Sequence, residues 1–393
     1  MPLDIAAVQK ALTADGLDAW LLYDFHGSNP VSAGLASGGK GGHLATRRWF
    51  YLIPASGEPR ALVHAIERYN LDHLPGSKTV YAGREQLEAG LGQIVAGMKR
   101  VAMEYSPLAA IPYVSRVDGG TIELVRSLGV DVVSSGDLIQ QFEARWDEAA
   151  IASHRKASEA LYHIKDRAFA LVAKRLRDQV PTTEFDIQQS MVGWFKEEGL
   201  VAESAPCVSA QENAGNPHYL ATAADHRVIR KNELVLLDLW GKLAAPGTVY
   251  ADITWMGFVG EAVPEAMTRA FATICVARDA AVTVVQDAAK AGRDVRGFEA
   301  DRAARKVLID AGYSDAILHR TGHSLGEQVH GNGAHLDDYE THDERRLLPA
   351  TGFTIEPGLY FEDFGVRTEI NMVWPPGGPE VTGQRQKSIV TLT

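Results

Sequence analysis

The sequence predicts a two-domain protein in which a smaller α/β domain precedes a larger α+β domain. At 393 residues the chain exceeds what one ordinary hydrophobic core supports. Its first part alternates short β-rich runs with helical patterns, whereas its second part combines long helical patterns with separate strands. We therefore expect an N-terminal domain at residues 1–144 and a C-terminal domain at residues 145–393.

The N-terminal domain should begin with a helix and continue as a sheet with interleaved helices. The opening segment has no continuous apolar run, and Asp4 precedes an amphipathic pattern, so we expect a capped helix rather than a signal peptide or membrane span. The expected strands are DAWLLYD, RRWFYLIP, RALVHAI, KTVYA, RVAMEYS and VDVVSS, with helices at QLEAGLGQIVAG and GGTIELVRSLG.

The C-terminal domain should begin with a long helix from Asp147 to Arg177, where Ala, Leu and Ile recur at three- and four-residue spacing. Further helices are expected at TEFDIQQSMVGWFKEEG, VPEAMTRAFATICVARDAAVTVVQDAAKAG and FEADRAARKVLIDAG. Strands are expected at SAPCVSAQENAGNPHY, ELVLLDLWG, VYADITWMGFVG, GFTIEPGLYF and GVRTEINMVW. Paired strands with segregated long helices are typical of an α+β domain.

Charge and cysteine content exclude two classes of partner and site. The chain has 39 basic and 50 acidic residues, a formal charge of −11, and no basic cluster that could bind nucleic acid. Cys207 and Cys275 are its only cysteines, too few for a disulfide framework or a thiolate zinc site. A reducing compartment fits this content, and we expect a cytoplasmic protein.

The segment GLASGGKG, residues 34–41, almost matches a phosphate-binding loop. Gly41 stands where that loop needs a Ser or Thr hydroxyl to bind magnesium, and no strand leads directly into the segment. We expect a surface loop there.

Three histidines lie close together in ILHRTGHSLGEQVHG, residues 317–331. On a helix, His319 and His323 would share a face, but Arg320 replaces the glutamate of a helical zinc-peptidase motif and glycines interrupt the segment. Metal binding and simple hydrogen bonding in a glycine-rich turn, for these two and for His330, both remain open from this segment alone.

Four acidic residues lie inside runs that otherwise favour buried strands. They are Asp238 in ELVLLDLWG, Asp252 in YADITW, Glu356 in FTIEPGLYF and Glu369 in VRTEINMVW. Each could face solvent from a half-exposed strand, but a buried carboxylate without a positive partner would cost several kcal/mol or become protonated. If the four converge, each close pair repels by roughly 4 kcal/mol at an effective dielectric near 20.

Cations must offset that repulsion. Arg367 lies two residues before Glu369 on the same strand face, but one guanidinium cannot neutralise four acids. Two divalent cations can, with one neutral imidazole completing the ligand shell. This hard, oxygen-rich set suits Mn²⁺ first and Co²⁺ or Zn²⁺ less specifically.

These residues resemble the pita-bread metallopeptidases, specifically the two-domain branch that holds prolidase and aminopeptidase P. The motifs NAGNPHY, YADIT, HRTGHSLGEQVH, IEPGLY and VRTE are similar to family motifs in the expected order through the C-terminal domain. The N-terminal domain resembles this creatinase/prolidase-type branch more loosely. The resemblance is closest to prolidase, and it implies a pita-bread catalytic domain.

The resemblance implies a metal site with five ligands. Asp252 and Glu369 would bridge two ions, Asp238 would bind one, and His323 with Glu356 would bind the other. A bridging hydroxide would be the nucleophile, and Glu356 would also shuttle a proton to the leaving nitrogen.

Other positions gain roles from the same resemblance. His218 would shape the pocket for proline, and His330 would hydrogen-bond the scissile carbonyl and stabilise its oxyanion. His319 and Arg367 would hold ligands in place, with Tyr360 as a weaker candidate for that role.

Three departures from the family pattern accompany the match. Trp255 stands where the family usually has Arg after the Thr of YADIT, and Gly331 replaces a residue that is often acidic. The two metal aspartates are also further apart than expected, with a turn predicted at Pro246-Gly247. No metal ligand is lost.

The activity implied is hydrolysis of the bond before proline, foremost in Xaa-Pro dipeptides, by a cytoplasmic homodimer whose N-terminal domain serves dimerisation and substrate access. The alternative within the family is aminopeptidase P, which acts on longer Xaa-Pro peptides. More remote alternatives are a creatinase or sulfonium lyase and a non-catalytic binding protein, classes that lose or alter the metal ligands. Neither nucleic acid nor membrane is expected as a partner.

Overall fold

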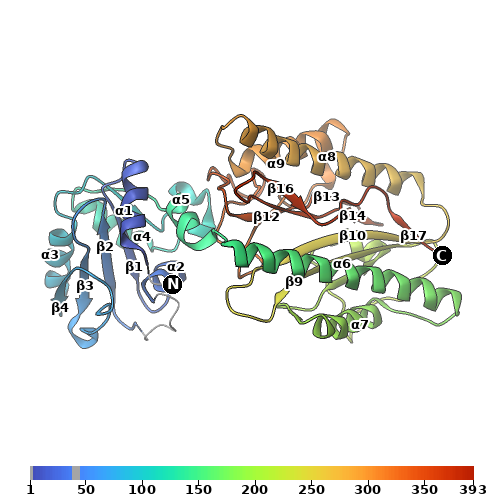
Figure 1. The fold of residues 1–393 in the computed structure, drawn as a ribbon, viewed down its shortest axis with the longest axis horizontal. Helices are drawn as coiled ribbons and strands as arrows, with labels where there is room; N and C mark the ends of the chain where they lie inside the picture. The colour runs from blue at the N-terminus through green and yellow to red at the C-terminus, as the bar shows by residue number, and fades with distance from the viewer. Residues whose placement is uncertain (1–2, 38–44) are drawn as a thin grey trace. The chain divides into compact units, whose positions relative to one another are not determined.

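A computed structural model describes residues 3–37 and 45–393 of the chain (Figure 1). The chain divides into two compact units, Met1–Glu143 and Ala144–Thr393, beside the boundary expected between residues 144 and 145. Within the described residues, no helix is long and apolar enough to cross a membrane.

The N-terminal unit is built on one sheet with helices on both faces. Its strands run in the order β4-β3-β2-β1-β5-β6, and each expected strand is present. They are β1 (Ala19–Asp24), β2 (Trp49–Pro54), β3 (Arg60–His64), β4 (Ser77–Tyr81), β5 (Arg100–Met103) and β6 (Asp131–Ser134). The helices are α1 (Ile5–Ala14), α2 (Pro30–Ser37), α3 (Arg84–Ile94), α4 (Gly119–Ser127) and α5 (Gly136–Ile139).

Helix starts in this unit follow the expected capping chemistry. The side chain of Asp4 accepts a hydrogen bond from the Ala7 amide at 3.0 Å, which begins α1 at Ile5 as predicted. The surface loop predicted for residues 34–41 is wrong for 34–37, which form the end of α2, because Val31 and Leu35 bury an apolar face there. Residues 38–41 lie outside the described residues.

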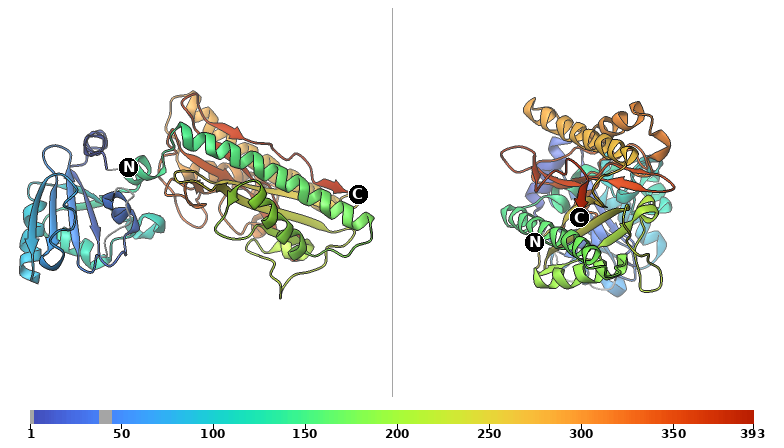
Figure 2. Two further views of the ribbon diagram at one scale, coloured as in Figure 1. Left: turned by 60° about the horizontal axis from the view of Figure 1, so that its bottom comes forward. Right: turned by 90° about the vertical axis from the view of Figure 1, so that its right-hand side faces the viewer.

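The C-terminal unit carries its strands between two pairs of helices (Figure 1). The pair α6 (Glu148–Arg177) and α7 (Glu184–Glu197) packs on one side, and the pair α8 (Glu265–Lys290) and α9 (Gly297–Asp310) packs on the other (Figure 2). Asp147 begins the long helix by accepting from the Ala150 amide at 2.7 Å.

Two sheets and a hairpin form the middle layer. The first sheet has the order β17-β10-β9-β7 with β8 also on β9, and the second has the order β11-β12-β15-β16. The first contains β7 (Leu200–Val201), β8 (Cys207–Ala210), β9 (Leu234–Leu243), β10 (Ala251–Val259) and β17 (Val390–Leu392). The second contains β11 (Ser324–Leu325), β12 (Gly352–Ile355), β15 (Ile370–Val373) and β16 (Glu380–Thr382), while β13 (Gly358–Tyr360) and β14 (Gly365–Arg367) form the hairpin.

Two strands that were predicted to be continuous are broken, each at an acidic residue. GFTIEPGLYF divides into β12 and β13 around Glu356, because Pro357 has no amide hydrogen to donate. GVRTEINMVW divides into β14 and β15, and the Glu369 amide donates across to the Thr254 carbonyl at 3.3 Å. Both acids therefore lie at strand breaks rather than inside strands.

The strand predicted at SAPCVSAQENAGNPHY is also shorter than expected. Only β8 is extended, after which the chain turns at Gln211–Gly215 and continues as a loop through His218. Asn, Gly and Pro favour turns over strands, which explains the early end.

Candidate metal centre

The register of two antiparallel strands places the first two acidic residues on one face. Asp238 of β9 lies opposite Thr254 of β10, and Asp252 is two residues before Thr254. Side chains two residues apart share a face of a strand, so Asp238, Thr254 and Asp252 project to the same side. The turn predicted at Pro246-Gly247 is confirmed, with Gly247 at a φ of 73°.

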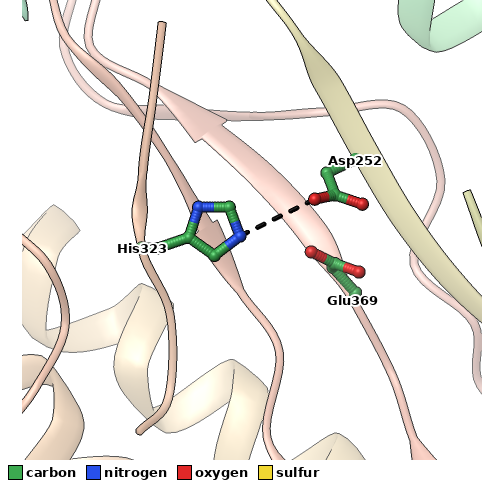
Figure 3. Close-up of side chains that lie close together, drawn as sticks. All are labelled: Asp252, His323 and Glu369. Carbon is green, nitrogen blue, oxygen red and sulfur yellow. Dashed lines mark ion pairs between the residues drawn. The ribbon is translucent and has the colours of Figure 1, made fainter. Parts of the chain in front are cut away.

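Three of the expected ligands converge from segments far apart in the sequence. Ligand atoms of Asp252, His323 and Glu369 all lie within 4.8 Å of one another, and the side chains point toward a common space (Figure 3). The His323 Nε2 atom is 3.6 Å from Asp252 Oδ2 and 3.4 Å from Glu356 Oε1. The structure thus brings four of the five predicted ligands to one point.

The histidine ring is held with one nitrogen free to face that space. His323 Nδ1 lies 3.1 Å from the Ser324 carbonyl oxygen, which can only accept, so Nδ1 carries the hydrogen. In the neutral ring, Nε2 then presents its lone pair to Asp252 and Glu356, as a metal-binding histidine requires.

The fifth predicted ligand, Asp238, pairs with a buried arginine. Arg367 is 4% exposed and donates to Asp238 through Nη2. It also donates to Tyr360 Oη through Nη1 and to Thr254 Oγ1 through Nε, both at 3.0 Å. One guanidinium therefore connects the β14 hairpin strand to the acidic face of β9 and β10.

His319 does not join the carboxylates. Its Nδ1 atom is 2.6 Å from the Arg320 carbonyl oxygen and its Nε2 atom is 2.7 Å from Tyr360 Oη. Since Nδ1 donates to the carbonyl, Nε2 accepts from the Tyr360 hydroxyl, which in turn accepts from Arg367. His319 thus fixes the Tyr360 hydroxyl, and this hydroxyl in turn holds the Arg367 guanidinium.

Three polar residues that the sequence reasoning did not single out fix the ligands. Thr254 Oγ1 donates to Glu369 Oε2 at 2.8 Å, and Thr354 Oγ1 donates to Glu356 Oε1 at 3.0 Å. The Asn371 amide group bonds both backbone groups of Asp252, at 2.9 and 2.5 Å. Each lies two residues from a predicted ligand, a spacing that could have indicated them.

Burial leaves this cluster poorly able to carry its full negative charge. It raises the pKa of Asp252 to about 7 and, with Asp252 adding its own repulsion, raises that of Glu369 well above its ordinary value. Burial likewise raises the pKa of Asp238 against the opposing charge of Arg367. At Glu356 burial is the largest single effect, but the protonated His323, His319 and Arg367 together outweigh it and lower the pKa.

Two buried carboxylate oxygens at the centre accept no hydrogen bond from any described residue. They are Asp252 Oδ1 and Glu369 Oε1. Buried acceptors are almost always satisfied, and here the possible metal-ligating groups brought together are the carboxylates of Asp252, Glu356 and Glu369 and the imidazole of His323. This set fits divalent cations that prefer oxygen and nitrogen ligands.

The two remaining predicted histidines are exposed. The ring of His330 lies against that of His323, with centroids 4.3 Å apart and planes at 52°. His218 lies in the loop after Gln211–Gly215. Of the three clustered histidines, only His323 lies among the carboxylates.

Two of the three sequence departures, Trp255 and Gly331, are accommodated away from the ligands. Trp255 faces the opposite side of β10, where Lys165 Nζ lies 3.9 Å over its ring and Tyr162 meets its edge. A Cβ atom at Gly331 would come within 2.9 Å of the Leu325 backbone, so an acidic side chain has no room there.

Comparison with known proteins identifies the class of this fold and site. The model of metallopeptidase family M24 matches residues 152–374, more than half of the chain. The chain belongs to this family, whose members have the pita-bread fold, and it is a metallopeptidase. The predicted fold class is thereby confirmed.

Curated relatives of the chain include two dipeptidases. A probable dipeptidase PepE of Mycobacterium bovis is 26% identical over 320 residues, covering 81% of this chain and 78% of its own. An Xaa-Pro dipeptidase of Lactobacillus delbrueckii subsp. lactis is 30% identical over 239 residues, covering 59% of this chain and 58% of its own.

Solved structures agree in fold over nearly the whole chain. Dipeptidase PepE of Mycobacterium ulcerans superposes with a TM-score of 0.69 at 23% identity, covering 99% of this chain and 96% of its own. Prolidase of Thermococcus sibiricus gives 0.62 at 20% identity and 98% coverage of both chains. An X-Pro aminopeptidase of Thermotoga maritima gives 0.58 at 20% identity and 99% coverage of both.

Proposed function

We propose that this metallopeptidase hydrolyses the peptide bond before proline in Xaa-Pro dipeptides, with two divalent cations bound by Asp238, Asp252, His323, Glu356 and Glu369. The main support is the pair of buried carboxylate oxygens, on Asp252 and Glu369, that no described group satisfies. The likeness to an Xaa-Pro dipeptidase supports the substrate class.

The charge balance favours two ions over one. Four carboxylates and one neutral imidazole carry four negative charges, and Arg367 neutralises part of the charge on Asp238 alone. Two divalent ions, Mn²⁺ first and Co²⁺ or Zn²⁺ as alternatives, would balance the set. When bound, such ions supply an activated water and polarise the scissile carbonyl.

The chain's own residues would hold the substrate and move protons around that chemistry. Glu356, whose pKa is lowered by the basic groups around it taken together, can accept a proton and pass it to the leaving nitrogen. His330, exposed beside His323, can donate to the scissile carbonyl as negative charge develops on its oxygen. His218, on the neighbouring loop, would contact the proline side.

The remaining roles concern support and assembly. Arg367 and His319, connected through Tyr360, would hold Asp238 in place. A homodimer in the cytoplasm, with the N-terminal unit at residues 1–144 serving dimerisation and substrate access, stays a prediction.

A substrate panel with metal analysis tests the proposal. The purified protein is assayed on Ala-Pro, Ala-Pro-Ala and Ala-Ala with and without Mn²⁺, and bound metal is counted by mass spectrometry. We expect Mn²⁺-dependent cleavage of Ala-Pro and little cleavage of Ala-Ala. Asp252→Asn, which keeps the side-chain shape and removes its charge, serves as the inactive control.

The panel also separates the rivals. Cleavage of Ala-Pro-Ala without cleavage of Ala-Pro would replace the dipeptidase proposal by an aminopeptidase acting on longer peptides, as the X-Pro aminopeptidase fold allows. A protein that binds metal but cleaves none of the three peptides would refute hydrolysis before proline.

A further inference from the structure

The loop that carries His218 has little regular structure to hold it. After the turn Gln211–Gly215 it runs without a strand or helix to β9, and the His218 ring is exposed. A loop of this kind is mobile unless other groups fix it. A side chain on this loop that contacts the substrate contributes more to substrate affinity when its position is fixed before binding, because less conformational entropy is then lost.

One buried carboxylate collects hydrogen bonds from both sides of His218. Glu184, the first residue of α7, is 0% exposed. It accepts from Asn213 Nδ2 at 3.0 Å and from the Tyr219 hydroxyl at 2.6 Å, five residues before and one residue after His218. The Arg227 amide, near the end of the loop, donates to it at 2.9 Å.

The same carboxylate also accepts from the backbone of Ala210, at the end of β8, at 2.6 Å. No described cation pairs with Glu184, so these donors alone satisfy its buried charge. Hydrogen bonds to a charged acceptor are stronger than neutral ones, and a buried charge is costly when its donors leave. Glu184 therefore ties the loop to α7 and β8.

The opposite side of the loop packs against the hairpin that leads to Arg367. A Cβ atom at Gly365 would lie 1.9 Å from the Ala214 carbonyl oxygen, and one at Gly215 would lie 2.4 Å from that of Phe361. These contacts exclude any side chain between the two backbones. The loop is thus held between the hairpin on one side and Glu184 on the other.

We propose that Glu184 is a positioning residue, which holds the His218 loop so that the imidazole meets the proline side of the substrate. This inference rests on the proposed function, because it concerns that substrate. Glu184 lies on α7 and its carboxylate accepts hydrogen bonds from loop and β8 atoms, so it acts on catalysis through the loop.

The test is the isosteric variant Glu184→Gln, which places a donor where the loop groups also donate. We expect KM for Ala-Pro to rise about tenfold while kcat stays within about twofold and the metal content is unchanged. Glu233→Gln is the matched control, because Glu233 bonds the side chain of Arg227 and the amide of Arg230 but not the atoms beside His218. It should leave KM unchanged.

A double-mutant cycle with His218→Ala asks whether Glu184 acts through the histidine. We expect the two effects on KM to be strongly non-additive, because His218→Ala removes the imidazole that Glu184→Gln would displace. Additive effects, or an unchanged KM in Glu184→Gln, would overturn the inference. If Glu184→Gln does not fold, Tyr219→Phe removes one of the donors to Glu184 and should raise KM by a smaller factor.

The two levels of proposal fail differently. An unmodified protein that does not cleave Ala-Pro refutes the proposed function. An active unmodified protein whose Glu184 and Tyr219 variants keep the parent KM refutes the positioning role alone.

Discussion

Replacing Arg367 by methionine should destabilise the metal-free protein far more than the metal-loaded one. Methionine keeps much of the apolar stem and removes the guanidinium that bonds the predicted ligand Asp238. Without metal, Asp238 would then be a buried carboxylate with no cation beside it. With metal bound, the divalent charge takes over that neutralisation.

The size of the effect follows from the three contacts of Arg367. Its hydrogen bond to the charged Asp238 contributes about 1.5–3 kcal/mol, and those to Tyr360 and Thr254 about 1 kcal/mol each. Breaking a buried ion pair by removing one partner costs about 3–5 kcal/mol, which agrees with that sum. We expect about 3–5 kcal/mol lost without metal and about 2 kcal/mol lost with saturating Mn²⁺.

Urea unfolding in chelator and in Mn²⁺ measures both values. Arg278→Met is the matched control, because Arg278 is also buried and its guanidinium bonds three residues, Thr368, Gln386 and Asp279. None of these is a predicted ligand, so its loss should cost the same with and without metal. An equal cost of Arg367→Met in the two conditions would refute its role in neutralising the cluster.

Other predictions test the ligands and their surroundings. Glu356→Ala should abolish turnover and halve the bound metal, and full activity in this variant would disprove its role. His330→Ala should keep the metal but lower kcat about 100-fold, as loss of an oxyanion donor does. Because burial raises the pKa of Asp252 to about 7, the folded metal-free protein holds a proton that the unfolded chain releases near pH 4. The unfolding free energy in chelator should therefore fall as the pH rises from 4 to 7. The stabilisation by Mn²⁺ should grow over the same range, because the cation binds the deprotonated carboxylate. Gly331→Ala should cost about 1–3 kcal/mol through its clash with Leu325, with unchanged metal content by mass spectrometry.

Much of the fold could be read from periodicity, because each strand and helix carries its own apolar pattern. All six strands of the N-terminal sheet and the long helix after Asp147 were predicted in this way. The strand breaks at Glu356 and Glu369 were missed, since an apolar β-rich run does not reveal where its backbone leaves the hydrogen-bonded ladder.

The sequence alone indicated four acidic candidate ligands, because acids in apolar runs are costly unless something neutralises them, and the family resemblance added His323. It also indicated that the glycines around His323 prevent a helical site. Only the tertiary structure decided which groups meet: that Thr254, Thr354 and Asn371 fix the ligands, and that His319 supports Arg367 through Tyr360. Two of these contacts, Thr254 with Glu369 and Asn371 with Asp252, join residues more than a hundred positions apart. Local patterns specify the face on which a side chain lies, whereas the packing of sheets and helices specifies its partner.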